Sequence, residues 1–465
     1  MTHLTLLLVY SIAQIVLGLW IARRVRSTSD FFVAGRRLGP GLLLATFLAA
    51  NIGAGSTVGA AGLGYRDGLS AWWWVGSAGI GSLFLAMWVG PRIRRLAAQH
   101  DFRTVGDFLE WRYGKRVRLV VAVLLWFNTL TILAAQLIAI STIVSVVAGL
   151  PKYVGCVLGG IVITTYFMAG GLVSSVGVNV VQLTVKFVGF GVALPLALSA
   201  AGGLDTLRAA QPTPEFWNFM SGGGSGWIYV AMLAPAFVVS PGLIQKVFGA
   251  RDDRAVRIGV GLNAVLLMVF AIVPALLGMV ARVLHPDLPN RELALPMLLT
   301  SNLPPAVGTL GLAAVFSAEL SAADAILFML ATSLSKDLYQ RFLNPAADDR
   351  RVLAVARGAA VAGGVLGVAL AIVAETIIGS LTIFYTLMTV ILFVPLLGGL
   401  YTRRLGTTEA LAAIAAGVSA LVALQLWNDG MGIGPIPPPI IGLGAAAMAC
   451  ALAMMVVPAS HAKTL

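Results

Sequence analysis

The sequence predicts an all-α polytopic membrane protein, and two observations lead to that fold class. Hydrophobic residues make up 59% of the 465 residues and charged residues 11%, whereas a soluble domain carries roughly 25% charged residues. The apolar residues also gather in about thirteen stretches long enough to cross a bilayer as helices. The expected spans are 4–22, 41–64, 71–91, 119–148, 152–170, 178–200, 226–248, 258–281, 304–335, 353–374, 377–400, 408–427 and 437–458.

The basic residues predict the orientation of these spans. The net charge of +12 is spread over short loops, which argues against a nucleic-acid-binding surface and is typical of topology signals. Alternate loops hold about 25 basic residues in one set and about 5 in the other, and the richer set, which includes the predicted loop Lys246–Arg257, is expected in the cytoplasm. We therefore expect a multi-pass protein of the plasma membrane with its N-terminus outside and its C-terminus in the cytoplasm.

Two of the spans carry glycine and proline where a helix is expected to break. Residues 48–64 read LAANIGAGSTVGAAGLG, and residues 234–244 read APAFVVSPGLI. Irregular backbone at membrane depth is tolerated where protein or a water-filled cavity satisfies it, and two such breaks in corresponding positions indicate a transporter site. The alternative is that the glycines only allow close helix packing. The breaks lie five spans apart, which fits two five-helix repeats.

The segments fall in an order that resembles a known family. Its motifs match NIGAGSTVGAAG (51–62), RTVGDFLEWRYG (103–114), YFMAGGLVSSVGVNVVQ (166–182), QKVFGARDDRAVRIG (245–259) and SLSKDLYQRF (333–342). In these stretches the chain resembles the sodium:solute symporter family. The resemblance implies the leucine-transporter fold, with two inverted five-helix repeats that move against each other in alternating access. It divides the chain into 1–38 (an extra helix and loop), 39–200 and 201–405 (the repeats), and 406–465 (two helices and a tail).

The resemblance also implies an ion site. In the family, backbone carbonyls and hydroxyls bind Na⁺, a hard cation. Ala49, Ile52 and Ala318 match the carbonyl positions and Ser321 matches a hydroxyl position. The second hydroxyl position falls on Ala322, which leaves four oxygens instead of five.

Four further polar residues bear on coupling. Asn179 stands where some members place a carboxylate, and Asp324 shares a helix face with Ser321. Lys186 lies about 10 Å beyond Asn179 along the span, toward the ion site. In sodium-independent carriers of this fold a lysine on this helix stands where sodium would bind. Glu319, two residues before Ser321, is expected to face away from the ion site.

These residues leave two hypotheses for coupling. In one, Asp324 and Ser321 bind Na⁺, the coupling ion, and no organic cofactor is needed. In the other, Lys186 and Asp324 replace Na⁺, so that transport is coupled to H⁺ or to no ion. A buried lysine–carboxylate pair that only fixes helix packing is a structural alternative.

The same alignment predicts a pocket for the transported solute, lined by Asn51, Gly53, Ser56, Phe237, Tyr385 and Thr389. A sugar needs many hydrogen-bonding groups, and this set has few. A small monocarboxylate or amino acid fits better, with its carboxylate at the half-helix N-terminus near Gly53–Ser56. The run Trp72–Trp74 is expected to anchor the outer interface instead.

No catalytic constellation is visible in the sequence, so an enzyme is not expected. The most favoured function is import of a small organic solute from the membrane's outer side, with a solute sensor of the same fold as a competing class. We expect the protein to act as a monomer within the lipid bilayer, with no nucleic-acid partner and no bound metal other than Na⁺.

Overall fold

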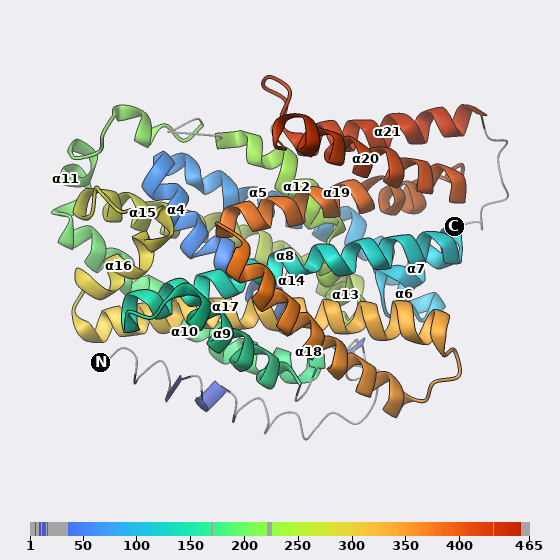
Figure 1. The fold of residues 1–465 in the computed structure, drawn as a ribbon, viewed down its shortest axis with the longest axis horizontal. Helices are drawn as coiled ribbons and strands as arrows, with labels where there is room; N and C mark the ends of the chain where they lie inside the picture. Colours follow the sequence, from blue (N-terminus) through green and yellow to red (C-terminus); the bar gives the residue numbers. More distant parts are fainter. Residues whose placement is uncertain are drawn as a thin grey trace.

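The computed structural model describes residues 36–168, 171–220, 226–430 and 432–456, together with residues 5, 9, 10, 12–14 and 16. Within these residues the chain is helical, and it contains two isolated bridges but no strand. Most helices run along the long axis of the molecule (Figure 1).

The α-helices, in chain order, are α3 (Pro40–Asn51), α4 (Val58–Asp67), α5 (Trp72–Phe84), α6 (Gly90–His100), α7 (Val105–Tyr113), α8 (Lys115–Ala148), α9 (Lys152–Phe167), α10 (Gly171–Ala200), α11 (Gly203–Ala209), α12 (Tyr229–Val239), α13 (Pro241–Phe248), α14 (Asp253–Phe270), α15 (Ile272–Leu284), α16 (Ala294–Ser301), α17 (Pro305–Thr332), α18 (Asp349–Val373), α19 (Ile377–Tyr401), α20 (Thr407–Asn428) and α21 (Pro438–Val456). The chain also forms the 3₁₀ turn η2 (Ala54–Ser56) and the wider π-helical segments η4 (Leu85–Val89) and η8 (Ser333–Leu343).

The predicted number of membrane spans is not confirmed. Ten helical stretches among the described residues are long and apolar enough to cross a membrane, while Pro40–Asn51 and Lys152–Thr165 are apolar but shorter. The expected first span, 4–22, lies for the most part outside the described residues. The domain limits at 38, 200 and 405 stay predictions, and no helix of the described chain crosses them.

Both predicted helix breaks are present. Between α3 and α4, Ile52 and Gly53 adopt extended conformations (φ −97°, ψ 94° and φ −142°, ψ −157°). Between α12 and α13, Ser240 turns the chain (φ −56°, ψ 119°) and Pro241 starts the next helix. Proline has no N–H to donate into a preceding turn, so a continuous helix through Pro241 would lose a hydrogen bond. The two interruptions therefore follow from the local sequence.

The helix α17 forms the centre of the molecule. It continues into η8 and packs against α3, α8, α9, α10 and α18. All residues from 314 to 324 are buried, which includes both acids of this helix. Because charged groups in such surroundings need partners, the neighbours of α17 are where a site is expected.

The two ends of the molecule differ, and we name them by their short helices. The α7 end carries α6 and α7, and the α11 end carries α11 and α16 (Figure 1). The basic loops of the sequence predict that the α7 end faces the cytoplasm.

Candidate ion and solute site

The break between α3 and α4 is stabilised by nearby side chains. The Ser56 hydroxyl donates to the Asn51 carbonyl at 2.6 Å and accepts from the Gly53 N–H at 3.2 Å. The Ala54 N–H donates to Oε1 of Gln136 at 2.9 Å. Backbone groups freed by unwinding are thus satisfied inside the protein. Three N–H groups of the segment expected to bind a carboxylate, those of Gly53, Ala54 and Ser56, thus already have acceptors.

Gly53→Ala is expected to disrupt this break. A Cβ at position 53 would lie 2.5 Å from Cβ of Ala322 and 2.8 Å from Oε1 of Gln136. Overpacking of this kind costs about 1–3 kcal/mol, and it also pushes Gln136 off the Ala54 N–H. We expect lower thermal stability and strongly reduced solute uptake. Gly41→Ala is the matched control, because nothing lies within 4 Å of its added Cβ; equal losses in both variants would contradict the packing argument.

A small cavity of about 40 Å³ opens beside the break. Five of the six residues predicted to bind the solute line it, namely Asn51, Gly53, Ser56, Phe237 and Tyr385. The sixth, Thr389, is buried in α19 and is not part of the wall of this cavity. Most of the remaining wall is apolar, with Gln136 and Trp74 as further polar groups. The geometry thus offers a small, partly apolar compartment.

The expected role of the tryptophan run is wrong for Trp74. This side chain is buried, lines the cavity and packs edge-on against Tyr229 at 5.1 Å between ring centroids. Trp73 instead donates from Nε1 to the Phe219 carbonyl, and it stands next to Trp72. Consecutive residues of a helix point about 100° apart, so three tryptophans in a row cannot all face the same surroundings.

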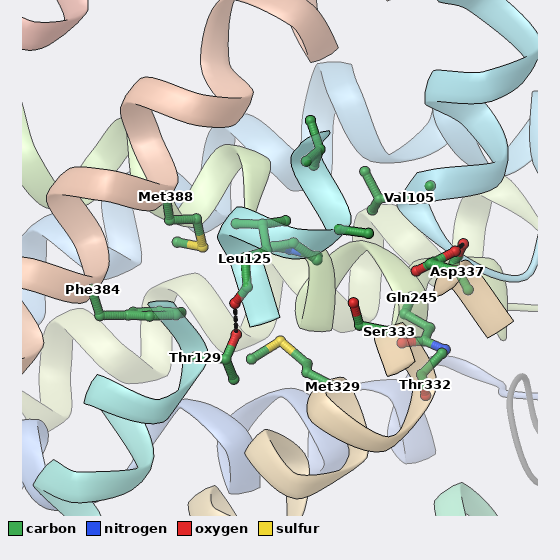
Figure 2. Close-up of a pocket in the computed structure, with 15 residues that line it drawn as sticks. Val105, Leu125, Thr129, Gln245, Met329, Thr332, Ser333, Asp337, Phe384 and Met388 are labelled. Carbon is green, nitrogen blue, oxygen red and sulfur yellow. Dashed lines mark hydrogen bonds between the residues drawn. The ribbon is translucent and has the colours of Figure 1, made fainter. Parts of the chain in front are cut away.

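Two more cavities extend from the first toward the α7 end. The second shares Phe237 and Tyr385 with the first and adds Lys246 and Met329 to its wall. The third shares Met329 with the second and reaches Asp337 (Figure 2). Figure 2 also shows the Thr129 hydroxyl, which donates to a carbonyl of its own helix at 2.6 Å. The shared walls place the three cavities in a row, from the helix break to the α7 end.

The residues predicted to hold the ion converge, and Lys186 lies among them. Its Nζ is 2.6 Å from Oγ of Ser321, 3.1 Å from the Ile52 carbonyl oxygen and 3.5 Å from the Ala49 carbonyl oxygen. The Ser321 hydroxyl lies 2.7 Å from the Ala49 carbonyl and 3.1 Å from the Ala318 carbonyl. Lys186 has no exposed surface. An ammonium group therefore sits within the set of oxygens that the sequence predicted for Na⁺.

The helix phase predicts that Glu319 faces away from the ion position, but the structure places it near Lys186. It is fully buried, and its Oε1 accepts a hydrogen bond of 2.9 Å from the Thr57 hydroxyl. It also interacts electrostatically with Lys186. Residues on the two sides of the break between α3 and α4 contact α17 at different positions, because Ala49 accepts from Ser321 and Thr57 donates to Glu319. Glu319 is the acidic neighbour of the Lys186 ammonium.

Asp324 lies one turn further toward the α7 end, beside a second buried lysine. Lys246 donates from Nζ to the Thr46 hydroxyl at 2.9 Å and interacts electrostatically with Asp324. Asn179 of α10, which stands where some family members are expected to place a carboxylate, is also buried. The region around α17 thus contains two lysines and two carboxylates, which balance in formal charge.

A cluster of ion pairs at the α7 end joins α7, α8 and η8. The guanidinium of Arg118 lies 2.9 Å from both Asp107 and Glu110 and 2.6 Å from Asp337. Arg341 binds Glu110 from the other side. Partial burial raises the pKa of the Glu110 carboxyl, but hydrogen bonds from Arg341 and Arg118 outweigh it and hold that pKa below its usual value. The cluster ties the end of α17 to the start of α8.

Sequence reasoning missed Gln136, Thr57 and Lys246. Lys246 had been counted with the basic residues of a loop, but it belongs to the half-helix α13 and is buried. A signal was present, because Lys246 precedes Val247 and Phe248 and so lies inside an apolar segment. For Gln136 the signal was an amide in an otherwise apolar stretch of α8. Thr57 had no distinguishing signal among the small residues around it.

The comparison with known proteins now decides the family. The sequence model of the sodium:solute symporter family matches residues 31–417. The chain belongs to this family. The sodium/pantothenate symporter of Escherichia coli (strain K12) is 29% identical over 460 residues, covering 92% of each chain. The sodium/iodide cotransporter of Homo sapiens is 26% identical over 445 residues, covering 88% of this chain and 67% of that one.

The solved structures agree on the fold of this symporter. A Na⁺-coupled sialic acid symporter superposes with a TM-score of 0.80 at 17% identity, covering 100% of this chain and 99% of that one. The complex of MhsT with L-phenylalanine gives a TM-score of 0.53 at 15% identity, covering 89% and 97%. The predicted leucine-transporter fold is confirmed. The family and its relatives identify a multi-pass membrane protein that acts as a Na⁺-coupled secondary transporter of small organic solutes.

Proposed function

We propose that this symporter imports a monocarboxylate or an amino acid together with Na⁺ by alternating access. In this proposal the protein lies in the plasma membrane with the α7 end in the cytoplasm, and the solute passes from the cavity at the helix break through the row of cavities toward that end. The observation that carries the choice of solute is Lys246, a buried cation in the wall of the second cavity.

The walls of the cavities support an organic acid over a sugar. The first cavity offers few hydrogen-bonding groups, among them Asn51, Ser56 and Gln136, and these already bond one another's backbone or a neighbouring residue. A polyhydroxylated solute would leave hydroxyls unpaired at a cost of about 1–3 kcal/mol each. A carboxylate gains a charge-assisted hydrogen bond from Lys246 instead. The sodium/pantothenate relative is named for a carboxylate as well.

The same lysine offers a route for coupling. Lys246 interacts electrostatically with Asp324 in the absence of solute. A solute carboxylate that pairs with Lys246 leaves the Asp324 charge to a second cation, and Na⁺ is the cation that the family uses. Solute and Na⁺ then favour each other's binding. The solute carboxylate replaces Asp324 as the partner of Lys246, and Na⁺ replaces Lys246 as the partner of Asp324.

Uptake into proteoliposomes tests this function. A thermal-shift screen of small organic acids and amino acids selects the solute, and its uptake is measured with Na⁺ in the medium and with choline in its place. We expect saturable uptake that falls at least tenfold in choline. Uptake that is unchanged in choline would contradict Na⁺ coupling, and no saturable uptake of any screened solute would contradict the carrier function and favour a sensor.

Two substitutions separate the roles of the charged residues. Lys246→Gln is expected to raise the KM for the acid about tenfold, and Asp324→Asn to raise the half-saturating Na⁺ concentration by a similar factor, since a lost charge-assisted hydrogen bond is worth about 1.5–3 kcal/mol. Lys115→Gln removes an exposed lysine at the α7 end and serves as the control. An unchanged KM in Lys246→Gln would exclude this lysine as the solute's partner.

A further inference from the structure

The family's shared ion position does not fit Na⁺ in this chain, because the Lys186 ammonium already uses its oxygens. Nζ of Lys186 is within hydrogen-bond distance of Ser321 and the Ile52 carbonyl. The Ser321 hydroxyl in turn donates to the Ala49 carbonyl at 2.7 Å. The Lys186 side chain, which comes from α10, thus links α3 to α17. The family resemblance implies that a bound ion makes this link in other members.

An ion and this ammonium cannot share the position. A hard cation such as Ca²⁺, similar in size to Na⁺, takes oxygen ligands at about 2.3–2.6 Å, and Nζ already lies 2.6 Å from Oγ of Ser321 and 3.1 Å from the Ile52 carbonyl oxygen. Two unit charges about 4 Å apart repel by about 4 kcal/mol at an effective dielectric constant of 20. The missing fifth oxygen, at Ala322, weakens the position further as a sodium site.

The charge of the ammonium is balanced within the protein. Glu319 interacts electrostatically with Lys186, and the Thr57 hydroxyl donates to its carboxylate. Both side chains are fully buried. The Glu319 carboxylate therefore supplies a buried counter-charge for the Lys186 ammonium.

We propose that the Lys186 ammonium is a tethered cation that occupies the shared ion position and closes it to Na⁺. The inference rests on the proposed function, because it concerns the same carrier. It places the coupling Na⁺ at a second site, whose acidic ligand is Asp324. The link between α3 and α17 at this position is then made by the chain itself and does not require a bound ion.

The first test compares the wild-type protein with Ser321→Ala. The thermal unfolding of the purified full-length protein is followed over a range of NaCl concentrations, with KCl and choline chloride as references. We expect the half-saturating Na⁺ concentration to change less than about twofold, because Ser321 bonds the lysine and not Na⁺. A tenfold or larger increase in Ser321→Ala would overturn the proposal. A wild type with no Na⁺ response fits a closed site but contradicts the proposed Na⁺ coupling, so the two failures are distinguishable.

The second test opens the position. Lys186→Ala removes the ammonium and leaves the oxygens with empty space, whereas Lys186→Met removes the charge and keeps most of the volume. We expect Lys186→Ala to gain a Na⁺-specific rise in Tm beyond the wild-type response, whereas Lys186→Met and the double variant Lys186→Ala/Ser321→Ala keep only the wild-type response. Equal Na⁺ responses in the Ala and Met variants would contradict the proposal. If neither variant folds, the comparison of the wild type with Ser321→Ala still shows whether Ser321 contributes to Na⁺ binding.

Discussion

Arg118→Ala is expected to lower the free energy of unfolding by about 3–5 kcal/mol, the usual result of removing one partner from a buried ion pair. Its side chain is 7% exposed, and it contacts carboxylates of α7 and η8 at 2.6–2.9 Å. Without the guanidinium, Asp337 keeps a hydrogen bond from the Thr104 hydroxyl but loses its cation. Because the cluster joins α8 to the end of α17, we expect the α7 end to open first.

Equilibrium unfolding in mixed micelles measures this effect, and limited proteolysis at the α7 end reports the opening. Arg116→Ala is the matched control, since Arg116 lies two residues away on the same helix and is exposed. We expect a change within about 0.5 kcal/mol for that variant. If Arg118→Ala is as stable as Arg116→Ala, the cluster contributes nothing and the proposed link between α8 and α17 is wrong. Arg118→Lys is expected to recover part of the loss, because one ammonium cannot bond three carboxylates in the way that the planar guanidinium does.

Glu319→Ala is expected to lower the free energy of unfolding by a similar amount, about 3–5 kcal/mol, and to abolish solute uptake. The substitution leaves the fully buried Lys186 without its acidic neighbour and removes one of the two acceptors of the Thr57 hydroxyl, the other being the Gly53 carbonyl. Thr57 follows the break between α3 and α4, so the effect reaches the segment that lines the solute cavity. The loss is measured by unfolding and by solute uptake in proteoliposomes.

Two further variants give the Glu319 experiment its controls. Glu319→Gln keeps an acceptor for Thr57 and removes only the charge, so its loss of stability is expected to be smaller than that of Glu319→Ala. Glu375→Ala removes an exposed acid at the turn between α18 and α19 and is expected to be neutral. Wild-type stability in Glu319→Ala would show that the carboxylate is not the counter-charge of Lys186.

Much of the site followed from the sequence because its signals are local. A glycine-rich stretch and a proline mark the two breaks, and the i, i+3 spacing of Ser321 and Asp324 fixes their shared face. Ala49, Ile52 and Ser321 came from motif positions, and the structure brings them together around Lys186. The proximity of Lys186 to this set also followed, from two turns of helical rise beyond Asn179.

The remaining parts depend on contacts that no local pattern records. Glu319 was expected to face elsewhere because it lies two residues from Ser321, about 200° around the helix. That reasoning holds for a helix with one buried face, but α17 is packed on several sides, and residues on both sides of the break contact it. Thr389 shows the converse, since this polar residue one helical turn after Tyr385 is buried but does not line the cavity. Lys246 was assigned to a loop because the end of a half-helix cannot be located from composition alone.

The lysine side chain at the ion position also bears on how much work the carrier can extract from the membrane potential. A translocated Na⁺ carries one elementary charge, which is worth about 2.3 kcal/mol per 100 mV. A tethered ammonium stays with the protein and contributes none of that energy when the carrier completes its cycle. Each ion replaced in this way lowers the attainable solute accumulation by about fiftyfold at 100 mV, since 1.4 kcal/mol corresponds to a factor of ten. In return, the link between α3 and α17 at this position no longer depends on external sodium, while the Na⁺ at Asp324 still drives uptake.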